Sequence, residues 1–225
     1  MHLAKKETEL HIKACNDHLA HHVEEFLAEK HVYGVNVMGA PGVGKTTVLE
    51  NIIRNLSCAT YVVEGDIESD IDTRRLQQQN IRAVQINTFG ACHLDAPLMH
   101  EAMHKMEFPE PGLLFIENVG NLVCPAEFNI GEDLRVAILS VPEGDDKVAK
   151  YPLMFETTDA LIMNKYDMKP YFDFDDRRAE RDALDANPDL AVFRVSARTG
   201  EGAERFLAWL SEKVNQKINK EEVSR

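Results

Sequence analysis

Apolar and polar positions alternate along the chain in a pattern that predicts an α/β fold. Short apolar runs of strand length recur, separated by segments with the three- and four-residue apolar spacing of amphipathic helices. The expected strands span residues 35–38, 60–63, 83–86, 113–117, 136–141, 160–163 and 191–195. The expected helices span residues 46–56, 73–79, 95–106, 174–186 and 203–214. This alternation predicts a mostly parallel central sheet with helices on both faces, in three layers.

The first 31 residues are more polar than the rest and rich in histidine. Their apolar positions have helical spacing and predict one amphipathic helix with a packed side. The residues expected on that side are Ile12, Leu19, Val23, Phe26 and Leu27. We therefore expect an N-terminal helical appendage, residues 1–31, followed by a single domain, residues 32–225.

Composition narrows the class of protein. Of the 225 residues, 44% are apolar and 28% are charged, as in ordinary globular proteins. The net charge of −13 argues against a nucleic-acid partner, which requires a basic surface. Apolar runs reach only strand length, so we expect no membrane span and no signal peptide. A cytoplasmic location follows, where the four cysteines are expected to be free or metal-binding rather than disulfide-bonded.

Residues 39–46 read GAPGVGKT, an uninterrupted G-x-x-x-x-G-K-T phosphate-binding loop. The motif lies between an expected strand and an expected helix, the context of a true P-loop rather than an unliganded glycine-rich turn. Glycines let the backbone N–H groups point inward at phosphates, and the helix N-terminus adds partial positive charge. Lys45 is expected to reach the β- and γ-phosphates. The expected phosphate contacts are Gly39, Gly42, Val43, Gly44, Lys45, Thr46 and Thr47.

Residues 164–167 read NKYD and follow an expected strand. The Asp167 carboxylate can accept from the N1–H and exocyclic amine of guanine, which adenine lacks there. The stem of Lys165 can cover the base, and Asn164 can tie the loop to the P-loop. A second loop matches the S-A-K/R pattern at Ser196, Ala197 and Arg198. In a P-loop chain, the two patterns together favour GTP and GDP over ATP.

Acidic residues at strand ends are candidates for a magnesium site and for catalysis. We expect Asp66, Asp72 and Glu117 to hold Mg²⁺ together with the Thr46 hydroxyl. Gly120 is expected to offer its N–H to the γ-phosphate. The proposed catalytic set is Lys45, Asp66, Glu117 and Gly120. Helix capping or a solvated loop is the alternative for Asp66 and Asp72.

Hydrolysis of GTP to GDP and phosphate is expected to be slow in the isolated protein. The sequence contains no recognisable arginine finger in cis and no glutamine that is clearly placed to orient water.

Cys92 and His93 follow the third expected strand, and Cys124 follows the fourth by a few residues. Both segments leave carboxyl ends of strands, so the three side chains can meet on the nucleotide side of the sheet. Two thiolates and an imidazole suit Zn²⁺ or Ni²⁺. One chain supplies only three ligands, so a closed site needs a fourth ligand or a second copy. From spacing alone, buried free cysteines are the stronger alternative.

Several segments together are similar to one family. QINT at 85–88, ACHLDA at 91–96, FIENVGNLVCPA at 115–126, and EGDDK at 143–147 followed by KYP at 150–152 resemble HypB, the nickel-insertion GTPases of hydrogenase maturation. The similarity runs in order from about residue 33 to residue 202. The resemblance implies a signal-recognition/MinD-like GTPase that forms a homodimer when GTP is bound.

The resemblance also implies a role and a metal site. Members of the family deliver nickel to the large subunit of [NiFe] hydrogenase and work with a small zinc-binding partner, HypA. The family's metal site between subunits would fall on Cys92, His93 and Cys124. Lys147 and Lys150 either reach across such a dimer to the other nucleotide or are surface charges.

The N-terminal segment lacks the cysteine-rich nickel motif or long histidine tract of many members. His18, His21 and His22 have helical spacing and could form a weak nickel site, with His11 and Cys15 nearby in sequence. A solvated polar helix face is the favoured alternative for these residues.

Other functions stay open at this stage. A urease nickel chaperone is expected to carry C-P-H, whereas Leu94 follows Cys92 and His93 here. A cobalamin-enzyme chaperone would lack the paired cysteine segments. A nucleotide-dependent scaffold with structural zinc and a small-molecule kinase are further alternatives, although the N-K-x-D motif argues against a kinase.

Overall fold

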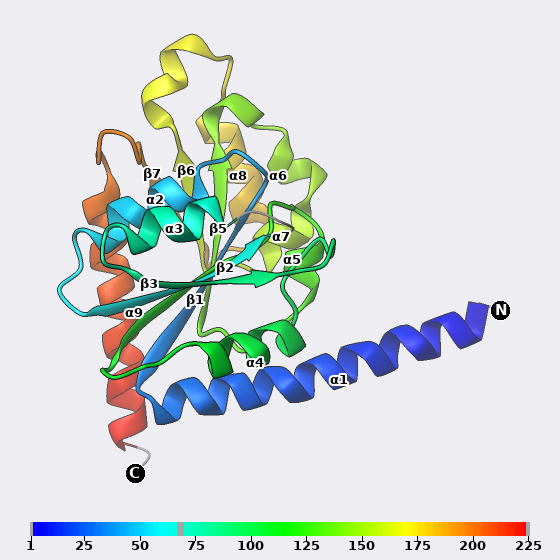
Figure 1. The fold of residues 1–225 in the computed structure, drawn as a ribbon. Coiled ribbons are helices and arrows are strands. Elements are labelled where there is room, and N and C mark those ends of the chain that lie inside the picture. The colour runs from blue at the N-terminus through cyan, green and yellow to red at the C-terminus, as the bar shows by residue number, and fades with distance from the viewer. Residues whose placement is uncertain (1, 67–69, 224–225) are drawn as a thin grey trace.

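The computed structural model describes residues 2–66 and 70–223. Residue 1 of the expected appendage, and residues 67–69 and 224–225 of the expected domain, lie outside the described residues. Within the described part, seven parallel strands form one sheet in the order β3-β2-β4-β1-β5-β6-β7 (Figure 1). They are β1 (Val32–Gly39), β2 (Ala59–Asp66), β3 (Arg82–Asn87), β4 (Gly112–Glu117), β5 (Leu134–Ser140), β6 (Ala160–Asn164) and β7 (Ala191–Arg194). The predicted parallel α/β sheet is confirmed.

Long and short helices connect these strands. The long ones are α1 (His2–Glu29), α2 (Lys45–Ile53), α3 (Ile71–Gln77), α4 (Ala96–Lys105), α8 (Asp176–Ala186) and α9 (Ala203–Val223). The short ones are α5 (Cys124–Glu127), α6 (Lys147–Lys150), α7 (Pro152–Glu156) and the 3₁₀ turns η1 (Val141–Glu143) and η2 (Tyr166–Tyr171). The short helices were not predicted, because one turn is too short to show a helical period.

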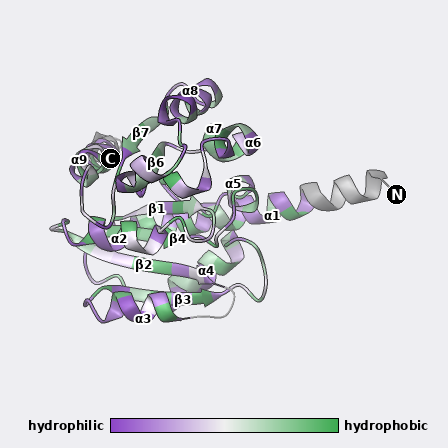
Figure 2. Cartoon of the chain, turned by 90° about the horizontal axis from the view of Figure 1, so that it is seen from above, coloured by the Kyte–Doolittle hydropathy of each residue, from purple (hydrophilic) through white to green (hydrophobic). Residues whose placement is uncertain are grey.

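Helices cover both faces of the sheet, as predicted. On one face, α2, α3 and α9 pack on the strands through residues such as Leu49, Leu76 and Phe206. On the other, α1 and α4 cover β2 and β4, and the α5–α8 region covers β5 and β6. Figure 2 shows α8 as mostly hydrophilic, and its buried apolar residues are only Ala179 and Ala183. Two apolar layers therefore enclose the sheet.

Three details of the prediction were wrong, the first being that the helix expected over residues 203–214 continues to Val223. Ile12 was expected on the packed side of α1 but is 55% exposed, because the first half of that helix extends past the sheet (Figure 1). The buried positions of α1 include Ala20, Val23 and Leu27, and also the polar Asn16. The helix expected from residue 174 begins at Asp176, since the Asp175 side chain accepts from two backbone N–H groups and caps it.

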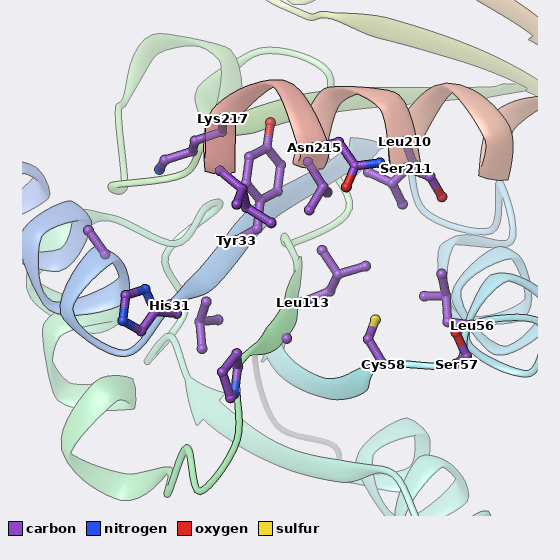
Figure 3. Close-up of a pocket in the computed structure, with 16 residues that line it drawn as sticks. His31, Tyr33, Leu56, Ser57, Cys58, Leu113, Leu210, Ser211, Asn215 and Lys217 are labelled. Carbon is purple, nitrogen blue, oxygen red and sulfur yellow. The ribbon is translucent and has the colours of Figure 1, made fainter. Parts of the chain in front are cut away.

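The two edges of the sheet differ in character. Because every strand is parallel, all carboxyl ends meet at one edge, where ligands bind in such folds. At the amino ends of β1 and β4 lies a cavity of about 610 Å³, lined mostly by apolar side chains including Leu113 and Leu210 (Figure 3). Among the described helices, none is long and apolar enough to cross a membrane.

Candidate nucleotide and metal site

The phosphate-binding loop connects β1 to α2 at the carboxyl edge. Gly42 and Gly44 have φ angles of 77° and 93°, which favour glycine over residues with a side chain. A Cβ at Gly44 would lie 2.8 Å from the Asn164 side-chain nitrogen. Lys45 and Thr46 open α2, and each is only 8% exposed. The loop therefore has the curled backbone that directs N–H groups at an anion.

Asn164 joins three loops at the end of β6. Its Nδ2 donates to the Val43 carbonyl at 2.8 Å, and its Oδ1 accepts from the Ala197 N–H at 3.1 Å. Lys165 adopts a left-handed conformation with φ of 56°, and its Nζ donates to the Gly42 carbonyl at 2.6 Å. The expected contact between the N-K-x-D loop and the P-loop is thus present.

Asp167 faces the loop that follows β7. Its Oδ1 accepts from the Ser196 hydroxyl at 2.7 Å, and its Oδ2 lies 4.0 Å from Arg198 Nε. Ser196 and Ala197 are buried, whereas the Arg198 side chain is 87% exposed. The residues proposed to recognise guanine therefore form one connected group beside the P-loop.

Glu117, at the end of β4, is a buried carboxyl group beside the P-loop. Thr46 donates its hydroxyl to Glu117 Oε1 at 3.0 Å, while Oε2 is buried without a hydrogen-bond partner. Burial raises the pKa of Glu117 to about 7, although the nearby Lys45 ammonium opposes the shift. Burial likewise lowers the pKa of Lys45, and Glu117 is the foremost of the carboxylates that counter it. An unpaired oxygen in such a place is one that a ligand can satisfy.

The donors here fit Mg²⁺. A hydroxyl and a carboxylate with an unpartnered oxygen are hard oxygen ligands, which this ion prefers. Asp66 ends β2 and Asp72 lies in the first turn of α3, and both are close enough to Lys45 to raise its pKa. The four candidate magnesium ligands, Thr46, Asp66, Asp72 and Glu117, therefore surround the same lysine.

The segment after β4 lies directly against the P-loop. A Cβ at Gly120 would approach the backbone of Pro41 to 2.9 Å, so only glycine fits this contact. The Asn121 N–H donates to the Gly39 carbonyl at 3.1 Å and forms an isolated bridge with that residue. Residues 120–121 are therefore in direct contact with the P-loop backbone.

Cys92, His93 and Cys124 come together a short distance along this edge. Their ligand atoms all lie within 4.8 Å of one another, and the two sulfur atoms, of free thiols, are 2.8 Å apart. The His93 ring stacks on Phe128 with centroids 4.3 Å apart. Burial lowers the pKa of His93, which favours the neutral imidazole, and raises the pKa of Cys124. The set of two sulfurs and one imidazole suits Zn²⁺ or Ni²⁺.

Two asparagines connect the loop that carries Cys92 and His93 to β1 and to the P-loop. Asn118 is 1% exposed, and its Oδ1 accepts from the Leu94 N–H at 2.9 Å. Asn121 donates from Nδ2 to the Cys92 carbonyl at 3.4 Å, in addition to its backbone bond to Gly39. The segment 118–121 therefore contacts both the loop that carries Cys92 and the P-loop.

Comparisons with known proteins agree with this geometry. The family model for the CobW/HypB/UreG nucleotide-binding domain matches residues 34–194. The hydrogenase maturation factor HypB of Azotobacter chroococcum mcd 1 is 48% identical over 181 residues, 80% of this chain and 59% of that relative. The hydrogenase/urease maturation factor HypB of Helicobacter pylori is 38% identical over 217 residues, 94% of this chain and 90% of that relative.

A crystal structure of HypB from Helicobacter pylori in complex with nickel is similar to this fold. The TM-score is 0.86 at 38% identity, with 90% of this chain and 96% of that chain covered. This chain belongs to the HypB group of the CobW/HypB/UreG family. It spans about three-fifths of the length of the HypB relatives from Azotobacter.

Membership of the HypB group confirms the resemblance found in the sequence. The matched residues 34–194, which extend from β1 to β7, are the nucleotide-binding domain of the family. The P-loop, the N-K-x-D loop, and the Cys92, His93 and Cys124 cluster all lie within or at the border of the matched region.

Sequence reasoning missed Glu64, a buried carboxyl group in the HypB site. Glu64 pairs in register with Glu117 on the adjacent strand, and Thr73 donates its hydroxyl to it. Burial raises the pKa of Glu64 to about 7, and neighbouring Asp72 and Asp66 raise it further. A charged residue directly after the apolar run Tyr61–Val63 was the available signal.

Lys147 and Lys150 are the first and last residues of α6. Lys150 pairs with Asp146 one turn earlier, which raises the pKa of Lys150 and lowers that of Asp146. That either lysine reaches a second nucleotide across a dimer stays a prediction.

Proposed function

We propose that this protein is a GTP-hydrolysing nickel metallochaperone that assists insertion of nickel into [NiFe] hydrogenase. Membership of the HypB group supports the role in hydrogenase maturation, and the Helicobacter pylori relative has been crystallised with nickel. The observation that carries the proposal is the path from the P-loop through residues 118–121 to Cys92 and Cys124. Through these contacts, the bound nucleotide, GTP or GDP, alters the affinity of the metal site for nickel.

In this proposal, GTP is held by the loops at the ends of β1, β6 and β7. Asp167 accepts from the guanine edge, Lys165 covers the base, and Asn164 fixes both loops relative to the phosphates. Ser196, Ala197 and Arg198 complete the base pocket. A base without the matching donors leaves the half-buried Asp167 carboxylate unpaired, which gives GTP its preference over ATP.

Lys45 and the carboxylates around it supply the chemistry of hydrolysis. Lys45 neutralises charge on the β- and γ-phosphates, and the Gly120 N–H binds the terminal phosphoryl group. Thr46, Glu117, Asp66 and Asp72 would hold Mg²⁺, which would supply neutralisation of phosphate charge. Turnover is slow in the isolated protein, because no arginine among these residues approaches the phosphates.

Metal handling takes place at Cys92, His93 and Cys124. When residues 120–121 move with the terminal phosphate, the hydrogen bond from Asn121 shifts the backbone at Cys92. Cys124 shifts as well, because it is only three residues from Asn121. By reciprocity, bound nickel must then change nucleotide affinity by the same factor. The cysteine thiols must lose their protons to bind nickel as thiolates, so nickel affinity falls as the solution is acidified.

A second copy of the chain completes the metal site. The cluster offers three ligands, Cys92 is exposed, and the nearby apolar residues Phe89 and Val123 are 86% and 43% exposed. Two such clusters facing each other supply enough ligands and bury this apolar surface. We infer a GTP-bound homodimer that works with a HypA-like accessory protein and the hydrogenase large subunit.

The proposal is tested by measuring Ni²⁺ affinity, by competition with a chelating dye, in the GDP state and with a non-hydrolysable GTP analogue. We expect the two affinities to differ about tenfold, a usual size for such coupling. Asn121→Ala is expected to reduce the ratio without abolishing binding, because it cuts the bond to Cys92. Asn215→Ala on α9 is the matched control. Equal nickel affinity in both nucleotide states of the unaltered protein would refute the coupling.

A further inference from the structure

A second group of histidines lies outside the site described above, between α1 and α4. A hollow of about 440 Å³ there is lined by two pairs, His18 with His22 and His100 with His104. Within each pair, the residues are one helical turn apart, and the ring centroids are 4.6 Å and 4.7 Å apart. Two histidines at positions i and i+4 of a helix can chelate one metal ion.

The two helices hold these pairs side by side. At one end, the Asn16 side chain of α1 accepts from the Ala96 N–H at the start of α4, at 2.9 Å. At the other end, Phe26 packs edge-on against Phe108, with centroids 6.0 Å apart. The helices therefore run in the same direction, as Figure 1 also shows them adjacent. Both histidine pairs lie between these two fixed points.

The surroundings of the pairs suit metal binding. Buried Val23 and Met103 form an apolar floor, while all four imidazoles are exposed and accessible to an ion from solvent. His22 Nδ1 lies 3.5 Å from a carboxylate oxygen of Glu25, which leaves Nε2 to face a ligand. A carboxylate behind a ligating histidine is the usual outer partner at metal sites.

We propose that His18, His22, His100 and His104 form a second site for a divalent transition metal, with an all-imidazole ligand set. This set suits Ni²⁺, Cu²⁺ or Zn²⁺ and disfavours the hard ion Mg²⁺. Within the described chain, only Cys92, His93 and Cys124 already hold three ligand atoms within 4.8 Å of one another. Closure of the histidine site therefore requires rotation of the exposed side chains, which is fast.

The proposed histidine site is separate from the Cys92, His93 and Cys124 cluster but lies close to it along the chain. α4 begins directly after the Cys92 and His93 loop, so His100 lies about 6 Å along the helix axis from the first residue of α4. His21 is adjacent to His22 in the sequence, but its ring nitrogens lie 3.5 Å and 3.4 Å from carboxylate oxygens of Glu24 and Glu25. The site thus gathers histidines from two helices rather than from the N-terminal segment alone.

The experiment measures binding of Ni²⁺ and of Zn²⁺ alone by calorimetry, in the full chain carrying Cys92→Ser and Cys124→Ser. We expect residual binding that weakens at least about tenfold with His18→Ala/His22→Ala, and equally with His100→Ala/His104→Ala. The control His11→Ala/His21→Ala should retain it, because neither residue lines the hollow. Metal should also raise the melting temperature of the parent by bridging two helices, and should not do so in His100→Ala/His104→Ala.

Other results would overturn the site. Absence of residual binding would do so, as would binding that survives loss of His100 and His104. A thiolate-to-nickel charge-transfer band would instead assign the ion to one of the two remaining thiols, Cys58 or Cys15, whose sulfur lies 3.8 Å from His11 Nε2. Because the parent variant already lacks Cys92 and Cys124, these outcomes are independent of the nickel delivery proposed above.

Discussion

The nucleotide half and the metal half of the carboxyl edge are built in different ways. Asn164 and Lys45 are 1% and 8% exposed, and hydrogen bonds between loops hold the nucleotide half together. In the metal half, Cys92 is exposed and Cys124 half-buried, and three ligands stand at the surface. The nucleotide half is thus largely buried and hydrogen-bonded, whereas the metal half is a partly exposed set of three candidate ligands.

This difference follows from what each ligand requires of the protein. A triphosphate needs a preformed cradle of backbone N–H groups and a lysine, which one chain can supply. A transition metal that must be released needs an open coordination sphere, which partly exposed ligands facing each other in the proposed dimer would provide. The contacts of Asn118 and Asn121 join the two halves, so each can report on the other.

The largest expected effect is on the nucleotide half. Lys45→Ala should lower the rate of GTP hydrolysis by about 10²–10³, because it removes a buried positive charge from the phosphates. Phosphate release at saturating GTP measures the loss. Lys105→Ala, an exposed lysine at the end of α4, should leave the rate unchanged. A comparable loss of rate in both variants would show that Lys45 has no specific role in GTP hydrolysis.

A smaller effect is expected in the metal half. Cys92→Ser should weaken Ni²⁺ binding by about 100-fold, while the melting temperature and GTP binding stay the same, because the thiol is exposed. Chelator competition and thermal denaturation measure the two quantities. Cys58→Ser, an exposed thiol at the opposite edge, is the control. A fall in melting temperature with Cys92→Ser would instead support a structural metal, as in the scaffold alternative.

The smallest effect concerns the buried acids beneath the nucleotide site. Burial raises the pKa of Glu64 from 4.5 to about 7, so its stabilising contribution is present below the unfolded pKa and disappears as pH rises through 7. Between about pH 5 and about pH 8, the nucleotide-free protein should lose about 2 kcal/mol more stability than Glu64→Gln. Denaturant unfolding at both pH values tests this. Parallel pH profiles would mean that Glu64 is not a buried acid.

The sequence predicted those features that depend on contiguous residues. The P-loop and the N-K-x-D loop are local motifs, and the strand and helix periods that frame them are also local, so sheet, layers and loop positions could be anticipated. Glu64 belongs to no motif, and Asn118 and Asn121 lie in a segment that resembles HypB but reveals nothing of their contacts, because these join residues far apart in the sequence.

Long-range packing explains the remaining misses. Ile12 fits a helical stripe, yet nothing in the spacing says that the sheet ends before it. The meeting of His18 and His22 with His100 and His104 depends on how α1 lies on α4, which periodicity does not encode. The roles of the individual site residues likewise stay predictions, since they concern ligands and a second chain.

The account depends most on a nucleotide-dependent dimer that completes the metal site. Light scattering after size-exclusion chromatography measures it directly, with GDP or a non-hydrolysable GTP analogue, each with and without Ni²⁺. We predict a dimer with the GTP analogue, further favoured by nickel, and loss of the nickel effect in Cys92→Ser. A monomer in all four conditions would contradict the central claim.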